Sequence, residues 1–403
     1  MFNWGNKVIV DQKKIDHLLT KNVEDVFVLE SLKKRLNSGK QLTIKLGFDP
    51  TGSKIHLGRA VTLHKLKEFQ DLGHKIVFVI GNFTAQIGDP SDKLEKRPML
   101  DKKEVQKNLR DYKNQIGTIL DLKKVEFRKN GDWLSKLTFS EITQLAESFT
   151  VSQMTSRRNF KERLDKGDEV SLREFMYPLM QGYDSVVINS DIEIGGFDQL
   201  FNLKAGRVIQ KFYKKQEQEV ITTVMLEGTD GRKMSTSWGN VVNITDEPND
   251  MFGKIMSLKD ELIVKYFKIC TEFKEADIDQ IEIAMKAGRL NPRNAKKTLA
   301  KEIVEIYHSA EDAGFAELNF ENIFSKGEVP EDVVEVKVEA GKDLVDVLLD
   351  QKIISSKNEW RRLIEQKGIT ILEKDLKVED PNYKISETET YRIGKKRFLK
   401  VLV

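Results

Sequence analysis

The sequence predicts an α/β protein in which a parallel β-sheet domain precedes a helical segment and a small mixed α/β module. Three observations support this prediction. A strand–helix–strand pattern runs from residue 42 to residue 81, and units of this kind build parallel sheets. After Pro248 the strand signals give way to short helical patterns. The last 63 residues carry a compact mixture of both patterns.

The elements of the sheet domain follow in order. The first forty residues are polar, with apolar residues at helical spacing, which predicts helices. The run 42–49 favours a strand, and the apolar spacing within 56–72 favours a helix. Residues 75–81 predict a buried strand, and the apolar run 185–194, followed by two glycines, predicts another. Open parallel sheets bind ligands at the carboxyl ends of their strands, so the residues after these runs are candidates for a site.

The remaining chain divides into smaller regions. Four short helices are expected over 251–256, 260–270, 277–287 and 292–309. A polar stretch with Gly and Pro then favours a linker. We therefore predict a sheet domain with an N-terminal helical segment over 1–247, a helical domain over 248–326, a linker over 327–340 and a small module over 341–403.

The composition excludes several classes of protein. The single cysteine, Cys270, excludes an intramolecular disulfide framework and a cysteine-rich metal site. The charge-free apolar stretch 76–88 is shorter than the roughly 18–20 residues that a membrane span needs. The N-terminus lacks the apolar core of a secretion signal. These observations predict a cytoplasmic protein that has no membrane partner, and the scattered histidines give no reason to expect zinc.

Positive charge is distributed unevenly along the chain. Lys and Arg number 67 against 64 Asp and Glu, a net charge of +3. Residues 341–403 hold 14 basic and 11 acidic residues, so the whole excess lies in this module. Basic excess favours contact with nucleic acid, which makes the module the candidate for that role.

The turn after the first strand is the first candidate site. Asp49 follows the strand, and His56 and Gly58 open the next helix. A helix N-terminus beside a histidine suits a phosphate, and a glycine without a Cβ lets a flat base approach the backbone. An ordinary strand–helix turn with one exposed histidine explains this segment equally well.

A second candidate is the loop 231–237, with the sequence GRKMSTS. Its glycine, its three hydroxyls and Lys233 could close over a polyphosphate, where the lysine acts as a mobile point charge. Such a string alone is more often a solvated loop. Its occurrence about 180 residues after the H-x-G turn strengthens the functional interpretation.

These two strings resemble the H-I-G-H and K-M-S-K-S motifs of class I aminoacyl-tRNA synthetases. Three more resemble the tyrosyl branch: GDPSDKLEKR at 88–97, Y-x3-Q-x2-D at 177–184 and GGFDQ at 195–199. The match extends from about residue 25 to 270 and continues in the C-terminal module. The chain is most similar to a bacterial branch with K-L-G before the first motif. The resemblance implies a Rossmann-like catalytic domain, a helical anticodon-binding domain and a dimer.

The resemblance also implies residue roles. Tyr177, Gln181 and Asp184 share one helix face by spacing, although core packing of the tyrosine remains an alternative. The implied tyrosine-binding residues are Thr84, Asp89, Tyr177, Gln181, Asp184 and Gln199. The implied ATP-binding residues are Gly47, Asp49, His56, Gly58, Asp198, Lys233, Met234 and Ser235. The implied catalytic residues, which stabilise the leaving pyrophosphate, are Thr51, His56, Lys93, Arg97 and Lys233.

Three positions depart from the family pattern. Arg59 replaces the second histidine of the first motif, and its guanidinium can donate to ribose or phosphate oxygens instead. Thr236 replaces the second lysine of K-M-S-K-S, which removes a cation from the loop. Lys45 stands where another bacterial branch carries a tyrosine that contacts the substrate phenol, and it receives no site role here.

The C-terminal module resembles the small RNA-binding domain named after ribosomal protein S-four. Its helix–turn–helix lies within residues 343–367, where Ser356 is expected to cap the second helix with Glu359 as capping-box partner. Phosphate contact rather than base recognition is expected, and a merely solvated charged face is the alternative. The candidate RNA-binding residues are Ser356, Lys357, Arg361, Arg362, Lys395, Lys396 and Arg397.

The resemblance implies a tyrosine–tRNA ligase activity, with tyrosine, ATP and tRNA(Tyr) as substrates. Mg²⁺ is expected to arrive with ATP and not in a protein metal site. Two alternatives stay open. Tryptophan could be the substrate, although the tryptophanyl relatives lack the GDPS string and the C-terminal module. The altered signature positions also allow an RNA-binding or splicing factor with a decayed active site.

Overall fold

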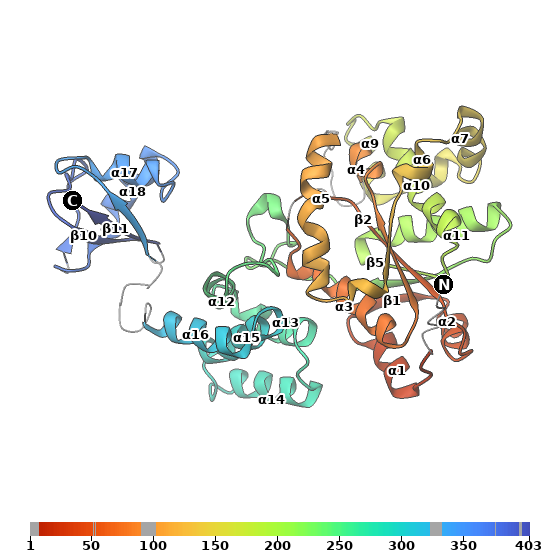
Figure 1. The fold of residues 1–403 in the computed structure, drawn as a ribbon, viewed down its shortest axis with the longest axis horizontal. Helices are drawn as coiled ribbons and strands as arrows, with labels where there is room; N and C mark the ends of the chain where they lie inside the picture. Colours follow the sequence, from red (N-terminus) through yellow and green to blue (C-terminus); the bar gives the residue numbers. More distant parts are fainter. Residues whose placement is uncertain are drawn as a thin grey trace. The chain divides into compact units, whose positions relative to one another are not determined.

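The computed structural model describes residues 8–50, 52, 54–89, 102–322, 333–374, 376–394 and 397–403 (Figure 1). The chain divides into two compact units, residues 1–313 and 314–403. No helix in the described ranges is both long and apolar enough to cross a membrane.

The first unit is built on a mixed sheet. In the described part its six strands have the order β1-β6-β5-β2-β3-β4. β1 pairs antiparallel with β6, and the other neighbours are parallel. The strands are β1 (Val23–Phe27), β2 (Thr43–Phe48), β3 (Lys75–Ile80), β4 (Val125–Lys129), β5 (Ile192–Gly196) and β6 (Glu219–Thr223).

The direction of strand addition reverses between β2 and β5. Helix α3 (Leu57–Asp71) connects β2 to β3, and α11 (Leu200–Phe212) connects β5 to β6. Right-handed crossovers in opposite directions place these helices on opposite faces of the sheet (Figure 1). The reversal leaves a crevice at the carboxyl ends of β2 and β5, the usual ligand position of such sheets.

Further helices precede β5 or follow β6, and those after β6 form a group of their own (Figure 1). Those before β5 are α1 (Gln12–Thr20), α2 (Leu29–Leu36), α4 (Thr84–Ile87), α5 (Lys102–Gly117), α6 (Gly131–Leu134), α7 (Phe139–Ala146), α8 (Val151–Thr155), α9 (Arg158–Asp165) and α10 (Leu172–Ile188). Those after β6 are α12 (Pro248–Met256), α13 (Ile263–Cys270), α14 (Glu275–Lys286), α15 (Pro292–Tyr307) and α16 (Ala310–Glu321). Short 3-10 turns are η1 (Leu122–Lys124), η2 (Phe197–Gln199), η3 (Thr236–Trp238) and η4 (Asp260–Leu262).

Most of the expected elements are confirmed. The strand–helix–strand unit appears as β2, α3 and β3, and the four helices after Pro248 appear as α12 to α15. The strand expected over 185–194 is wrong in its first half, because α10 continues to Ile188 and buries Val186 against α11. Asn189 then ends the helix with a left-handed φ of 54°, a conformation that asparagine tolerates well. The first forty residues, predicted to be helical, also contain the strand β1. Its pairing with β6 outweighs the helical spacing of apolar residues in this segment.

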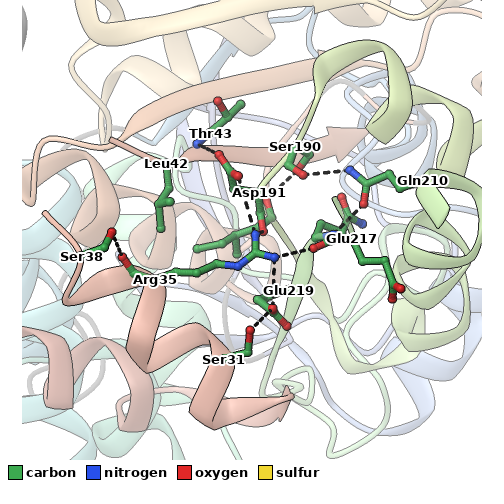
Figure 2. A network of polar contacts seen from close by, with 12 residues as sticks. Ser31, Arg35, Ser38, Leu42, Thr43, Ser190, Asp191, Gln210, Glu217 and Glu219 are labelled. Carbon is green, nitrogen blue, oxygen red and sulfur yellow. Dashed lines mark hydrogen bonds and ion pairs between the residues drawn. The ribbon is translucent and has the colours of Figure 1, made fainter. Parts of the chain in front are cut away.

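A polar network joins the amino-terminal ends of three strands (Figure 2). Arg35 of α2 donates to the carbonyl oxygens of Asp191 (3.2 Å) and Glu217 (2.6 Å) and pairs with the Glu219 carboxylate at 3.4 Å. Asp191 Oδ2 accepts from the backbone N–H of Thr43 at 2.8 Å. The guanidinium thus fixes the starts of β5 and β6, and Asp191 fixes the start of β2.

The second unit is a small α/β module. Among its described residues, five strands have the order β7-β11-β10-β8-β9. They are β7 (Val334–Lys337), β8 (Ile369–Ile371), β9 (Leu376–Lys377), β10 (Glu389–Ile393) and β11 (Arg397–Leu402), with helices α17 (Leu344–Asp350) and α18 (Lys357–Glu365). Leu348, Trp360 and Tyr391 lie in its buried core. β7 falls within the range expected to be a linker, because residues 334–337 pair in parallel with β11.

Candidate functional site

An open cleft of about 430 Å³ lies at the carboxyl ends of the central strands. It gathers fourteen residues that the sequence analysis assigned to tyrosine or ATP. They are Gly47, Asp49, His56, Gly58, Thr84, Asp89, Tyr177, Gln181, Asp184, Asp198, Gln199, Lys233, Met234 and Ser235. Three other candidates, Thr51, Lys93 and Arg97, lie outside the described residues.

Asp184 of α10 lies at the buried end of this cleft, with only 3% of its surface exposed. Its carboxylate accepts hydrogen bonds from Trp133 Nε1 at 2.8 Å and Asn130 Nδ2 at 3.3 Å. Burial raises the pKa of Asp184 to about 7, while the Lys45 charge and the two hydrogen bonds oppose that rise. The site thus holds a strong acceptor that ionises near neutral pH.

Asn130 and Trp133 belong to the site but were not predicted from the sequence. No motif includes either residue, and each contributes one donor to Asp184. Asn130 directly follows β4, so the rule that sites lie at strand carboxyl ends could have identified it. Trp133 in α6 carried no comparable signal.

Two further carboxylates, Asp49 and Asp89, line the same cleft. Asp49 accepts hydrogen bonds from the Tyr177 hydroxyl at 2.8 Å and the Thr84 hydroxyl at 2.7 Å. Burial and the nearby Asp49 raise the pKa of Tyr177 well above its usual value, so its phenol stays protonated. Asp89 accepts from Gln199 Nε2 at 2.6 Å. Two carboxylates in one cleft can attract an ammonium group.

Asp49 is therefore bonded to residues assigned to tyrosine, although the resemblance assigned it to ATP. The Asp49 carboxylate fits here because Gly81 has no side chain: a Cβ on Gly81 would lie 1.8 Å from Asp49 Oδ1. A third residue outside the motifs, Asn202, donates to Asp89 Oδ1 at 3.4 Å and accepts from Arg157 at 3.2 Å.

His56 is the N-cap residue of α3. Its Nδ1 accepts from the backbone N–H of Arg59 at 3.3 Å, which leaves the proton on Nε2. Burial, with the charges of Arg59 and Lys233, lowers the pKa of His56 to about 3. The imidazole is thus a neutral hydrogen-bond donor at a helix N-terminus, a position suited to phosphate oxygens.

Lys233 lies opposite this helix end. Its Nζ is 2.9 Å from Asp198 Oδ2, so the loop cation contacts a carboxylate that the resemblance assigns to ATP. Met234 Sδ lies 3.4 Å from the backbone nitrogen of Gly58. A Cβ on Gly58 would lie 3.2 Å from His56 Nδ1 and 3.5 Å from this sulfur, so the glycine keeps that wall of the cleft flat.

Two of the positions that depart from the family pattern line the same cleft. The Arg59 guanidinium lies 4.6 Å from the centre of the Phe48 ring and 3.4 Å from the Tyr112 hydroxyl. Thr236 is exposed at the cleft rim. The third position, Lys45, is fully buried behind the cleft.

No cluster of three or more potential metal ligands occurs among the residues that the structure describes. The carboxylates of the cleft each have neutral or cationic partners instead. This donor set provides oxygens beside an ATP-sized space, which suits a cation that arrives with the nucleotide's own phosphates.

The second unit has an exposed basic surface on α18. Lys357, Arg361 and Arg362 are exposed, and Ser356 caps the helix by accepting from the Glu359 N–H at 3.3 Å. The capping box is shifted by one residue, because Glu359 accepts from Ser355 rather than from Ser356. Glu359 also pairs with Arg397 at 2.8 Å, so this candidate RNA contact serves inside the module.

The two remaining RNA candidates, Lys395 and Lys396, lie outside the described residues.

Comparisons with known proteins agree with these motifs. Residues 37–325 match the family described as tRNA synthetases class I (W and Y). The tyrosine–tRNA ligase of Thermotoga maritima is 43% identical over 387 residues, covering 95% of this chain and 96% of the relative. That of Carboxydothermus hydrogenoformans is 46% identical over 387 residues, covering 93% of each chain.

Solved structures share the fold. A C-terminally truncated mitochondrial tyrosyl-tRNA synthetase of Aspergillus nidulans superposes with a TM-score of 0.62 at 22% identity, covering 77% of this chain and 94% of that one. The tyrosyl-tRNA synthetase of Archaeoglobus fulgidus complexed with L-tyrosine superposes with a TM-score of 0.59 at 21% identity. The match covers 76% of this chain and 99% of that one. With the family match and the close bacterial relatives, the chain belongs to the class I tRNA synthetases of the W and Y family, and within it to the bacterial tyrosyl-tRNA synthetases.

Proposed function

We propose that the chain is a tyrosine–tRNA ligase. It activates tyrosine with ATP to tyrosyl-adenylate and pyrophosphate, and then transfers the tyrosyl group to the 3′ end of tRNA(Tyr). The observation that carries this proposal is a single cleft lined by the buried Asp184 carboxylate and by His56 and Lys233. Asp184 suits a phenol, and His56 and Lys233 suit phosphates.

The activation step needs no side-chain nucleophile. The tyrosine carboxylate attacks the α-phosphorus of ATP, the bond to the β-phosphate oxygen breaks, and pyrophosphate leaves. His56 donates from Nε2, and Lys233 exchanges Asp198 for the departing phosphates. Catalysis is therefore positioning and charge stabilisation. Mg²⁺ bound to ATP would supply further positive charge when present.

Tyrosine selection follows from burial. The phenol hydroxyl would donate to Asp184, whose other partners are Trp133 and Asn130. Phenylalanine would leave the buried carboxylate without that donor, and an unsatisfied buried polar group is costly. The carboxylates Asp49 and Asp89 would hold the ammonium group together with Gln181.

Other regions complete the proposal. We assign 248–326 to anticodon recognition and α18 to phosphate contacts with tRNA, because its Lys357, Arg361 and Arg362 are exposed. A homodimer through the catalytic domain is supported by three exposed apolar side chains. They are Phe139, Val151 and Leu172, exposed by 82%, 72% and 80%. We place the enzyme in the cytoplasm, where its substrates occur.

Pyrophosphate exchange tests the activity directly. Labelled pyrophosphate should enter ATP in the presence of tyrosine and not of tryptophan or phenylalanine. Exchange that depends on tryptophan would favour the tryptophanyl alternative. Absence of exchange with all three, together with intact tRNA binding, would favour an RNA-binding factor with a decayed site.

The RNA surface has its own test. The double variant Arg361→Ala/Arg362→Ala should bind tRNA about tenfold more weakly and with a shallower salt dependence, because two phosphate contacts are lost. Lys367→Ala is the matched control, since Lys367 already pairs with Glu379 at 2.7 Å in the same module. Equal losses in both variants would contradict the assignment to α18.

A further inference from the structure

A fully buried ion pair lies directly behind the cleft. Lys45 of β2 and Glu193 of β5 are register partners on neighbouring parallel strands. Lys45 Nζ lies 2.9 Å from Glu193 Oε1, and both side chains are 0% exposed. Removing two charges from water is expensive, and an apolar pair of similar volume often stabilises a fold as well. Their position therefore needs a reason beyond packing.

The pair binds one turn of α10. Lys45 Nζ donates to the backbone carbonyl oxygen of Gln181 at 2.9 Å and to Ser185 Oγ at 2.8 Å. With Glu193 these partners use all three donors of the ammonium group. Glu193 accepts from Ser185 Oγ at 2.9 Å and from Gln181 Nε2 at 3.1 Å. Both charged groups are thus hydrogen-bonded to the segment 181–185, which also contains Asp184.

The contact with Glu193 sets the orientation of the Gln181 amide. A carboxylate only accepts hydrogen bonds, so the amide must direct its NH₂ group toward Glu193. The carbonyl oxygen of the side chain is then the end left for the cleft, which Gln181 lines. An oxygen there can accept from a substrate ammonium group, whereas an NH₂ group would repel it.

The same pair acts on Asp184. The groups that face this carboxylate are Trp133 and Asn130 from the α6 side, Lys45 from β2, Glu193 from β5 and Tyr177 from its own helix. Burial raises the pKa of Asp184, the Lys45 charge lowers it, and Glu193 raises it by less. Lys45 thus favours the ionised form that accepts a phenol hydrogen.

We infer that Lys45 and Glu193 form a positioning pair for tyrosine, which holds residues 181–185 so that Gln181 presents its carbonyl oxygen and Asp184 its carboxylate. This inference rests on the proposed function. Neither residue touches the substrate in this scheme, because both lie behind the cleft wall and act through α10.

The test uses variants of the full chain. Lys45→Met/Glu193→Gln removes both charges together, so that no unpaired charge stays buried. Ser185→Ala is the milder variant, because it keeps the ion pair and removes one hydroxyl that links it to α10. Lys65→Met is the matched control: Lys65 is also 0% exposed and pairs with Glu68 at 2.8 Å, but it donates to the Leu18 carbonyl oxygen rather than to the site.

In tyrosine-dependent pyrophosphate exchange, the double variant should raise KM for tyrosine about tenfold and Ser185→Ala about threefold, because a hydrogen-bonded carboxylate and amide lose their orientation. KM for ATP should stay within about twofold. The pH below which tyrosine binding fails should move upward in the double variant, since the cation beside Asp184 is gone. Lys65→Met should leave the KM for tyrosine and the pH limit of tyrosine binding unchanged.

The outcomes separate the two proposals. Absence of tyrosine-dependent exchange in the wild-type protein would overturn the proposed function and this inference with it. Exchange in the wild type, with the tyrosine KM and the pH profile unchanged in the double variant, would overturn the inference alone. If the double variant does not fold, Ser185→Ala decides: an unchanged tyrosine KM overturns the inference, and a selective rise supports it.

Discussion

The two ends of the central sheet both carry ionised side chains. At the amino-terminal end, Arg35 and the carboxylates of Asp191 and Glu219 are bonded to one another and to the backbone of the strands (Figure 2). At the carboxyl end, Asp184, Asp89 and Lys233 line an open cleft. Charge at the first end holds strands together, and charge at the second faces a space for ligands.

The difference shows how one fold separates stability from function. The first end mostly pairs each charge with an opposite charge or a backbone group that stays in place. The second holds Asp184 where burial opposes its ionisation. Functional sites commonly keep such unfavourable groups, and the rest of the fold must compensate for them. The comparison predicts that substitutions at the two ends affect different measurements.

The largest effect is expected for Lys233→Ala. It removes the mobile cation of the cleft, so the rate of tyrosine activation should fall by about 10²–10³-fold while tyrosine affinity changes little. Single-turnover adenylate formation and equilibrium binding of tyrosine measure the two quantities. Lys259→Ala, outside the motif, is the control. An equal loss of tyrosine affinity would mean that the loop does not act on the transition state.

Asp184→Ala should lower the preference for tyrosine over phenylalanine by about 10–100-fold. This factor corresponds to the roughly 1.5–3 kcal/mol that a hydrogen bond to a charged group usually contributes. The ratio of kcat/KM for the two amino acids in pyrophosphate exchange measures it. Unchanged selectivity would remove Asp184 from the phenol site. Stability should not fall, which distinguishes this end of the sheet from the other.

Arg35→Met should behave in the opposite way. It takes one donor from the Glu219 carboxylate, which keeps Ser31 and Arg207 as partners, and one donor from each of two carbonyl oxygens, so the free energy of unfolding should fall by about 2–3 kcal/mol. Tyrosine activation at low temperature should be unchanged. Lys67→Met, which breaks an exposed pair with Asp71, should cost less than about 1 kcal/mol. A selective loss of activity in Arg35→Met would undo the comparison.

A further effect concerns the dependence of stability on pH. The pKa of Asp184 in the folded protein is about 7, against about 4 for an unfolded chain. Between these values the folded state holds a proton that the unfolded state has lost, so the free energy of unfolding falls as pH rises through the window. Asp184→Asn lacks this term.

In thermal unfolding without ligands, the stability of Asp184→Asn relative to the wild type should therefore increase between about pH 4 and pH 7. Above about pH 7 this difference should stay constant. Asp71→Asn is the control, because Asp71 is largely exposed. Parallel pH curves for Asp184→Asn and the wild type would show that the carboxylate is ionised in the folded protein across the whole range.

Much of the site could be predicted from the sequence. The motifs are local strings, and their residues meet because consecutive strands of a parallel sheet end at one edge. Trp133 and Asn202 could not be found this way, since they reach Asp184 and Asp89 through space rather than through a motif. Asn130 belongs to no motif either, but it follows β4 at the same edge of the sheet. The end of α10 was also misassigned, because a buried apolar run fits a strand and a helix equally well.

The sequence by itself determined the family and the motif residues of the cleft, since these depend on residue identity and spacing along the chain. Only the tertiary structure decided what Lys45 does. In the sequence it is one lysine within an apolar run, and only the register of β2 against β5 places its ammonium group between Glu193 and the turn of α10. Such contacts arise from packing in three dimensions, which spacing along one strand does not encode.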